Sequence, residues 1–184
     1  MNRRLAQGFD GEAEPHPHAP VEAVVALGAN LGDRAETMAA AIVDLARLPL
    51  VDEVRASEPV ESVALKPEGR DAAAPAYLNA VAVLTTRLAP SVLLDYLHAI
   101  ERRHGRERSV PRSALEPGWE DRTLDLDLIA YGDVVSDDPA LLLPHPRAAE
   151  RDFVLGPWLA VDPDAVLPGV GRVDDALRRL RGEG

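Results

Sequence analysis

The spacing of apolar positions along the chain predicts strands and helices in alternation. Residues 21–30, VEAVVALGAN, form a short apolar run, which is typical of a buried strand. Residues 32–50 then carry apolar side chains at helical spacing behind Asp33, which opens a capping box of the D-x-x-E type. We therefore expect a strand followed by a helix, with Gly28 and Gly32 in a tight turn between them.

Four segments continue the pattern. Residues 52–62 have the composition of an edge strand because they contain a proline, and residues 76–88 that of a strand rich in β-branched side chains. Residues 63–75 between them have the composition of a mobile loop. An apolar stripe then predicts a helix over residues 92–105, with Ser91 as its N-cap. These segments add two strands and a second helix.

The C-terminal part adds a last core strand and appended elements. Residues 122–133, RTLDLDLIAYGD, are interpreted as a strand, residues 141–163 as a Pro-bounded loop, a short turn and a helix, and residues 172–184 as a small amphipathic helix. The order β-α-β-β-α-β is the split βαβ, ferredoxin-like pattern of the α+β class, an antiparallel sheet with helices packed on one face. The polar residues 1–20 are expected to form a disordered extension, which leaves residues 21–184 as a single domain.

Composition narrows the classes of protein. Apolar residues make up 46% and charged residues 28% of the 184 residues, which is typical of a soluble globular chain. No apolar run approaches the roughly 20 residues needed to cross a bilayer, and the N-terminus lacks the apolar region of a secretory signal. The absence of cysteine excludes disulfides and thiolate metal sites. We therefore expect a cytoplasmic protein.

Charge restricts the partners. The net charge of −11 opposes binding to nucleic acid and to anionic membranes over most of the surface. A phosphate site would then require a local basic cluster, and the arginine-rich residues 102–112 are a candidate. A solvated helix end followed by a loop is the alternative interpretation of the same run. Its position shortly before the strand 122–133 favours the phosphate interpretation.

Asp125 and Asp127 are unusual in a strand because aspartate is a poor strand former and like charges on one face repel. Residues i and i+2 of a strand share a face about 6.6 Å apart, so both carboxylates point one way and the intervening leucines point into the core. Two carboxylates at this spacing suit Mg²⁺, which completes its octahedron with water and phosphate oxygens. A solvent-facing strand with aspartates paired to basic residues is the alternative.

Three further groups of residues could contribute to a site. Tyr77 and Asn79 share a strand face, so the phenol ring can stack on a heterocycle and the amide can form a hydrogen bond with its edge. Packing of the tyrosine at a strand edge, with a local hydrogen bond of the asparagine, is the alternative. An arginine-containing loop with one tryptophan could close over a polyphosphate or could be an ordinary basic loop. It contains Arg106, Arg108, Trp119 and Arg122. Histidine, arginine and phenylalanine in the loop LPHPRAAERDF could meet phosphates and stack, or form a surface turn. Its residues are His145, Arg147, Arg151 and Phe153.

Together these segments resemble the hydroxymethyldihydropterin pyrophosphokinases, folate-pathway enzymes that move pyrophosphate from ATP to the hydroxymethyl group of a reduced pterin. The matching segments are LGANLGDR, YLNAV, LLDYLHAIERRHGRER, RTLDLDLIAYGD and LPHPRAAERDFVL, in the family's order. RTLDLDL followed by LPHPR is the most specific combination. The resemblance extends over residues 21–162.

The resemblance implies a role for each matching position. Asp125 and Asp127 would hold two Mg²⁺ ions that bridge the phosphates of ATP, the co-substrate. The catalytic residues would be Arg106, Arg122, Asp125 and Asp127. The pterin-binding residues would be Ser62, Leu65, Tyr77, Asn79 and Phe153. The ATP-binding residues would be His98, Glu101, Arg108, Trp119, Arg122, Leu128, His145 and Arg151. The partners would be ATP and a reduced pterin, with no nucleic acid and no membrane, and the chain would act as a monomer.

The chain departs from the family pattern at four places. Residues 119–122 read WEDR where the family has WGPR, which puts two acidic residues beside a polyphosphate site. The loop 109–118 is longer than is typical, His98 replaces a common glutamine, and residues 60–65 lack the usual prolines. None of these changes removes a metal ligand or a stacking residue.

Two other functions remain open from the sequence. A nucleotidyltransferase could use the same D-x-D pair, but it would need a third acidic residue and would release pyrophosphate rather than AMP. A non-catalytic ligand-binding module would leave Asp125 and Asp127 as surface charges and would not need the arginine-rich loop.

Overall fold

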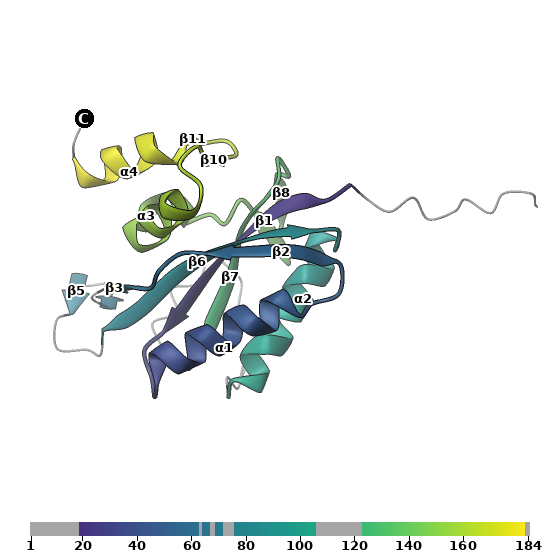
Figure 1. Ribbon diagram of the computed structural model, residues 1–184. Helices are drawn as coiled ribbons and strands as arrows, with labels where there is room; N and C mark the ends of the chain where they lie inside the picture. Colours follow the sequence, from purple (N-terminus) through teal and green to yellow (C-terminus); the bar gives the residue numbers. More distant parts are fainter. Residues whose placement is uncertain (1–18, 63, 67–68, 72–75, 106–122, 183–184) are drawn as a thin grey trace, which may run out of the picture.

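A computed structural model of the chain describes residues 19–62, 64–66, 69–71, 76–105 and 123–182. Its main sheet is antiparallel and runs in the order β2-β6-β1-β7, with β3 continuing beside β6 (Figure 1). The strands are β1 (Val21–Ala29), β2 (Val51–Ala56), β3 (Val60–Ser62), β6 (Tyr77–Thr86) and β7 (Asp125–Tyr131). This strand order agrees with the ferredoxin-like pattern predicted from the sequence.

The central strand β1 is apolar along almost its whole length because both of its faces are covered. It pairs with β6 from Val21 opposite Thr86 to Ala29 opposite Leu78. On its other side it pairs with β7, and a bulge at Val24 shifts the register of that pairing. The register of the three strands decides which polar side chains meet at the end of the sheet.

Helices α1 (Arg34–Ala46) and α2 (Pro90–Arg103) cover one face of the sheet. The predicted cap of α1 is confirmed, since the side chain of Asp33 accepts a hydrogen bond from the backbone N–H of Glu36 at 3.0 Å. The predicted cap of α2 is wrong. That helix begins at Pro90, whose fixed φ suits the first helical position, so the N-cap is Ala89 and Ser91 lies inside the helix.

The layer between these helices and the sheet is the larger of two apolar cores. The predicted apolar stripe of α2 consists of Leu93, Leu97 and Ile100, and it is confirmed because all three side chains are almost fully buried. The largest fully buried side chains of this layer are Leu27, Met38, Leu45, Leu84, Leu93, Leu97, Ile100, Leu124, Leu126 and Leu143. Burial of these side chains removes most of the apolar surface of α1 and α2 from water.

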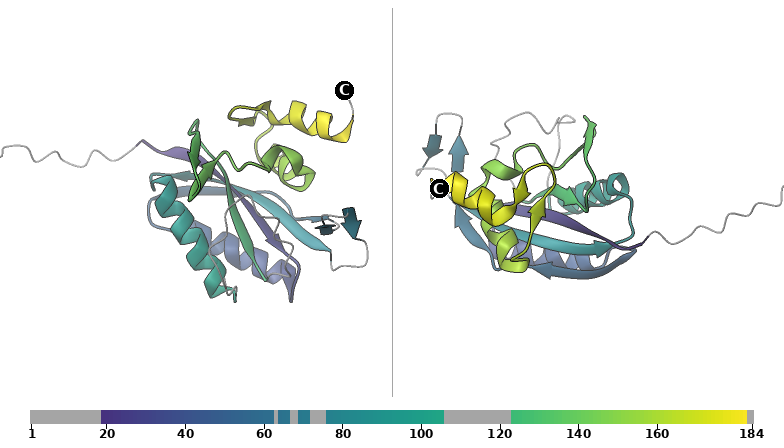
Figure 2. Two further views of the ribbon diagram at one scale, coloured as in Figure 1. Left: turned by 180° about the vertical axis from the view of Figure 1, so that it is seen from behind. Right: turned by 90° about the horizontal axis from the view of Figure 1, so that it is seen from above.

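The opposite face is covered by the appended helices α3 (Asp152–Val161) and α4 (Val173–Arg181), whose position on the sheet the sequence did not predict (Figure 2). The cause lies in the sheet, whose second face is apolar over part of its length and would otherwise be exposed. The main side chains of this second core are Val24, Val81, Val83, Ile129, Val154, Leu155, Trp158, Val173 and Leu177. Asn79, Gly28 and Asp125, which lie at one end of the sheet, are not part of this core.

The short elements refine the other predictions. The segment predicted as one edge strand forms both β2 and β3, interrupted at Ser57–Pro59. The predicted mobile loop contains the paired strands β4 (Ala64–Lys66) and β5 (Gly69–Asp71). The predicted Pro-bounded loop begins with a strand, β9 (Leu141–Leu143), paired with β8 (Ser136–Asp138). The turn and the helix that follow are confirmed, as η1 (Ala148–Glu150) and α3. A small hairpin, β10 (Val166–Leu167) and β11 (Gly171–Arg172), precedes α4.

Within the part of the chain that the structure describes, no helix is both long and apolar enough to span a bilayer. The predicted N-terminal extension falls outside the described residues except for residues 19 and 20.

Candidate functional site

Three strands bring polar residues to one end of the sheet. Asn79 of β6 lies opposite Gly28 of β1, and Gly28 lies opposite Asp125 of β7. In the next row that shares this face, Val81, Ala26 and Asp127 are aligned in the same way. The row of Asn79, Gly28 and Asp125 therefore lies on the face that carries α3, beyond the second core.

The prediction that Gly28 lies in a turn is wrong. It lies inside β1, whereas Gly32, with φ of +65°, is in the predicted turn. A Cβ atom at Gly28 would lie 3.7 Å from Oδ1 of Asn79, an ordinary contact. Gly28 places a residue without a side chain between Asn79 and Asp125, and only the pairing of strands from distant parts of the chain shows this.

The strand β7 presents the aspartates as predicted. Asp125 and Asp127 are half-buried on one face, while Leu124 and Leu126 on the other face are 0% and 1% exposed. The leucines anchor the strand in the larger core, so the side chains of the aspartates are held at the surface.

Glu101 of α2 holds this strand at its outer edge. Its Oε1 accepts a hydrogen bond from the backbone N–H of Leu126 at 2.9 Å, although the Glu101 side chain is fully buried. Because β7 is the outer strand of the sheet, every second N–H of its backbone points away from β1 and needs another acceptor. Glu101 therefore fixes the backbone between the two aspartates.

Arg151 and His145 converge on Asp127. Nη1 of Arg151 donates a hydrogen bond to Oδ2 of Asp127 at 2.8 Å, and Nε2 of His145 lies 4.0 Å from the same oxygen. The backbone N–H of His145 donates to the carbonyl of Ile129 at 2.8 Å, which fastens the loop after β9 to β7. One carboxylate oxygen thus faces two nitrogen-bearing side chains.

The surroundings of His145 lower its pKa. Its burial lowers its pKa below the usual value, and the nearby Arg151 lowers it further, while the charge of Asp127 acts in the opposite direction. Nδ1 of His145 accepts the backbone N–H of Arg147 at 3.2 Å, so the proton of the neutral ring is assigned to Nε2. The ring can therefore donate towards Asp127 or towards a ligand oxygen.

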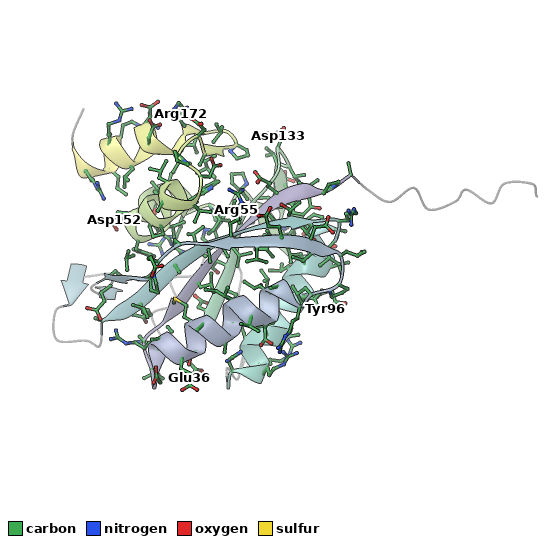
Figure 3. The ribbon with its side chains drawn as sticks, in the orientation of Figure 1. Glu36, Arg55, Tyr96, Asp133, Asp152 and Arg172 are labelled. Carbon is green, nitrogen blue, oxygen red and sulfur yellow. The ribbon has the colours of Figure 1, made fainter. Side chains whose placement is uncertain are left out.

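A groove of about 620 Å³ lies between β3 and α3. Ser57, Val60 and Ser62 line one side and Phe153 and Pro157 the other. Asp152, labelled in Figure 3, marks the start of α3 at this groove. The structure thus brings the predicted pterin residues Ser62 and Phe153 to one hollow.

The predicted stacking and bonding pair sits beside this groove. Tyr77 lies opposite Ser62 in the register of β6 and β3, and Nδ2 of Asn79 donates to Oγ of Ser62 at 2.8 Å. With the amide nitrogen engaged in this way, Oδ1 of Asn79 faces the space above Gly28. This end of the sheet can offer one hydrogen-bond acceptor and aromatic side chains to a planar heterocycle.

The remaining predicted residues are placed as follows. His98 is half-buried on α2, and Leu128 is 5% exposed in the larger core, on the face opposite Asp127. Leu65 lies in β4, but its side chain is not among the described ones. The predictions for four residues fall outside the described part of the chain, namely Arg106, Arg108, Trp119 and Arg122.

The donor set fits Mg²⁺ in combination with a substrate. Among the described residues, no group of three or more His, Cys, Asp or Glu side chains could hold a metal by itself. Mg²⁺ is usually bound by one or two carboxylates together with water and substrate phosphates. Asp125 and Asp127 supply two carboxylates on one face of the strand, so water and phosphate oxygens would complete the coordination of the ion.

The chain is similar to known proteins of one family. The family model described as 7,8-dihydro-6-hydroxymethylpterin-pyrophosphokinase matches residues 24–163. A protein of Haemophilus influenzae named 2-amino-4-hydroxy-6-hydroxymethyldihydropteridine pyrophosphokinase is 36% identical over 160 residues, which cover 87% of this chain and 93% of that protein. The protein of the same name from Pseudomonas aeruginosa is 39% identical over 160 residues, covering 87% and 92% of the two chains.

A solved structure shares the fold. The HPPK-DHPS of Plasmodium falciparum, crystallised with pterin and p-hydrobenzoate, superposes on 87% of this chain with a TM-score of 0.61 at 12% identity. The matched part is 44% of that solved chain, so the present chain spans less than half of it. This likeness confirms the predicted ferredoxin-like architecture.

Proposed function

Because this chain belongs to the 7,8-dihydro-6-hydroxymethylpterin-pyrophosphokinase family, we propose that it transfers pyrophosphate from ATP to the hydroxymethyl group of 6-hydroxymethyl-7,8-dihydropterin in the synthesis of folate. The observation that carries the proposal is the row of Asn79, Gly28 and Asp125. It sets a heterocycle-bonding amide and a metal-binding carboxylate on either side of a residue without a side chain. A pterin hydroxymethyl group and a triphosphate would meet across that space.

The proposed reaction is a substitution at phosphorus. The pterin hydroxyl oxygen forms a bond to the β-phosphorus of ATP, the bond from that phosphorus to the α–β bridging oxygen breaks, and AMP leaves with the bridging oxygen. The hydroxyl proton is released to water. Mg²⁺ bound through Asp125 and Asp127, two ions by the family resemblance, would neutralise the triphosphate.

The chain's own residues bind and orient the substrates. Phe153 and Tyr77 would stack on the pterin, while Oδ1 of Asn79 would accept a hydrogen bond from its edge. The guanidinium of Arg151 and Nε2–H of His145 would donate to phosphate oxygens near Asp127. We extend the proposal to Arg106 and Arg122 as donors to the transferring group, on the family resemblance alone.

The test is an assay of AMP formation from ATP and the reduced pterin in the presence of Mg²⁺. Asp127→Asn should lower the turnover at least a hundredfold while leaving the melting temperature close to that of the parent chain. Asp133→Asn is the matched control, since Asp133 is exposed in the turn after β7 (Figure 3), and its turnover should be unchanged. Near-normal turnover of Asp127→Asn would contradict the metal assignment.

Product identity separates this function from nucleotidyl transfer. Pyrophosphoryl transfer releases AMP, whereas nucleotidyl transfer releases pyrophosphate. We also propose that the chain acts as a monomer on small-molecule substrates, and sedimentation at assay concentration tests this.

A further inference from the structure

The ion pair between Arg151 and Asp127 occupies an oxygen that the proposed function assigns to a metal. Nη1 of Arg151 lies 2.8 Å from Oδ2 of Asp127, and the two side chains are only 20% and 30% exposed. A carboxylate oxygen that accepts a guanidinium N–H at this distance must give up that bond, or share the oxygen, when a divalent cation binds. The guanidinium and the metal therefore compete for Asp127.

The guanidinium of Arg151 can leave Asp127 without a change in the backbone, because the backbone and the side chain of Arg151 have separate hydrogen-bond partners. The carbonyl of Arg151 accepts hydrogen bonds from the N–H groups of Val154 and Leu155 at 2.9 and 3.0 Å, at the start of α3. The side chain takes no part in capping that helix. Asp127 is the one described hydrogen-bond partner of the guanidinium, which leaves most of its five N–H donors for other acceptors.

Phosphate oxygens are suitable new acceptors for these donors. An arginine binds phosphate through paired N–H groups, and such charge-assisted bonds are stronger than neutral ones. A triphosphate arriving at Asp125 and Asp127 would bring both the metal and a new partner for Arg151. Asp125, Asp127 and Arg151 together carry a formal charge of −1 while Arg151 is paired. Once the guanidinium has moved to the phosphates, the two carboxylates at the metal site carry a formal charge of −2.

We propose that Arg151 is an internal counter-ion of the metal site, which holds Asp127 until a nucleotide draws the guanidinium away. The proposal rests on the proposed function, because it takes Asp127 as a metal ligand. It follows that free Mg²⁺ binds this chain weakly and that metal and nucleotide bind cooperatively. By linkage, the factor by which nucleotide tightens metal binding equals the factor by which metal tightens nucleotide binding.

The test measures metal affinity in the absence of nucleotide. Mg²⁺ is titrated by calorimetry, and Mn²⁺ by electron paramagnetic resonance, into the full chain and its variants. Arg151→Gln should bind the bare ion roughly five- to tenfold more tightly, as expected for loss of one partly buried competing charge. Arg151→Lys keeps the charge and should stay within about twofold of the parent chain.

A matched control removes the same charge elsewhere on the sheet. Arg55 of β2 pairs with Glu22 of β1, so Arg55→Gln breaks an arginine–carboxylate pair that is not at the site. Its affinity for the bare ion should equal that of the parent chain. If it also rose several-fold, the effect would come from net charge and the proposal would be overturned.

A second titration measures the coupling. With α,β-methylene-ATP, in which the bond to be broken is replaced, the analogue should tighten Mg²⁺ binding by a smaller factor in Arg151→Gln than in the parent chain. Arg151→Ala provides a second variant if the glutamine variant does not fold, as judged from its melting curve. Unchanged or weaker binding of the bare ion by the folded variant overturns the proposal.

Failure of the proposed function has a different signature. In that case the parent chain would form no AMP and would bind the analogue equally well with and without Mg²⁺. A parent chain that forms AMP and binds the analogue only with Mg²⁺, together with a variant whose bare-ion affinity is unchanged, overturns the counter-ion role and leaves the function intact.

Discussion

Glu101→Ala tests whether the buried carboxylate positions the strand of the aspartates. The substitution removes the acceptor of the Leu126 N–H, whose bond length is 2.9 Å, from a side chain that is 0% exposed. The N–H of Leu126 would then be unpaired in a place where water cannot readily replace the carboxylate. We therefore expect both a loss of stability and a loosening of β7.

The magnitude follows from the type of bond. Leaving a buried N–H donor without an acceptor costs about 1–3 kcal/mol, and the cavity left by a truncated side chain adds to this loss. We expect a decrease of about 2–4 kcal/mol in the free energy of unfolding, which corresponds to a melting temperature lower by about 4–16 °C for a domain of this size. Glu101→Gln keeps an acceptor oxygen and should lose less than about 1.5 kcal/mol.

The assay has a global and a local readout. Denaturant unfolding gives the free energy, and amide hydrogen exchange reports the Leu126 N–H, which should exchange faster in Glu101→Ala than in Glu101→Gln. The exposed Glu53 of β2 supplies the control, since Glu53→Ala should change stability by less than about 0.5 kcal/mol. The reasoning is refuted if Glu101→Ala is as stable as the parent chain and the Leu126 amide remains equally protected.

Three further changes test other parts of the structure. Gly28→Val should fold normally but raise the KM for the pterin at least tenfold, because its methyl groups would enter the space between Asn79 and Asp125, and steady-state kinetics would show this. Trp158→Ala should lower the free energy of unfolding by about 3–5 kcal/mol in denaturant titration, since this side chain is 3% exposed in the second core. Burial raises the pKa of Tyr131, so its protonated form stabilises the fold below about pH 10 and that contribution is lost as the pH rises through the folded-state pKa. Tyr131→Phe removes the hydrogen bond from the phenol to the Leu88 carbonyl, so its free energy of unfolding at pH 8 should be lower by about 1 kcal/mol. In thermal melts at alkaline pH, its melting temperature should fall less steeply with rising pH than that of the parent chain.

For each of these three substitutions, one outcome would contradict the reasoning. An unchanged KM in Gly28→Val would mean that the pterin does not use the space above β1. A stable Trp158→Ala would mean that α3 does not bury the second face of the sheet. Equal alkaline slopes for the parent chain and Tyr131→Phe would mean that this phenol does not ionise on unfolding.

Local patterns in the sequence determine the features that depend on neighbouring residues. The alternation of leucine and aspartate in RTLDLDL predicts that Asp125 and Asp127 share a face, and the structure confirms it. The spacing of Asp33 and Glu36 likewise predicts a cap that is present. Both depend on backbone geometry within a few residues, which any strand or helix start of that composition would share.

Competing local signals explain the two wrong predictions at Ser91 and Gly28. Ser91 is a good capping residue, but Pro90 before it is equally suited to the first helical position, and the helix begins there. Gly28 reads as a turn residue because it ends an apolar run, yet β1 continues to Ala29. In both cases the chain offers two acceptable local structures, and packing of the neighbouring elements selects one.

Only the tertiary structure decides which distant residues meet. The pair Arg151 and Asp127 and the bond from Leu126 to Glu101 join residues 24 and 25 positions apart. The row of Asn79, Gly28 and Asp125 depends on the register of three strands, in which a slip by one residue would turn every side chain to the other face. That register is set by burial of both apolar faces at once, a property of the assembled layers rather than of any one segment.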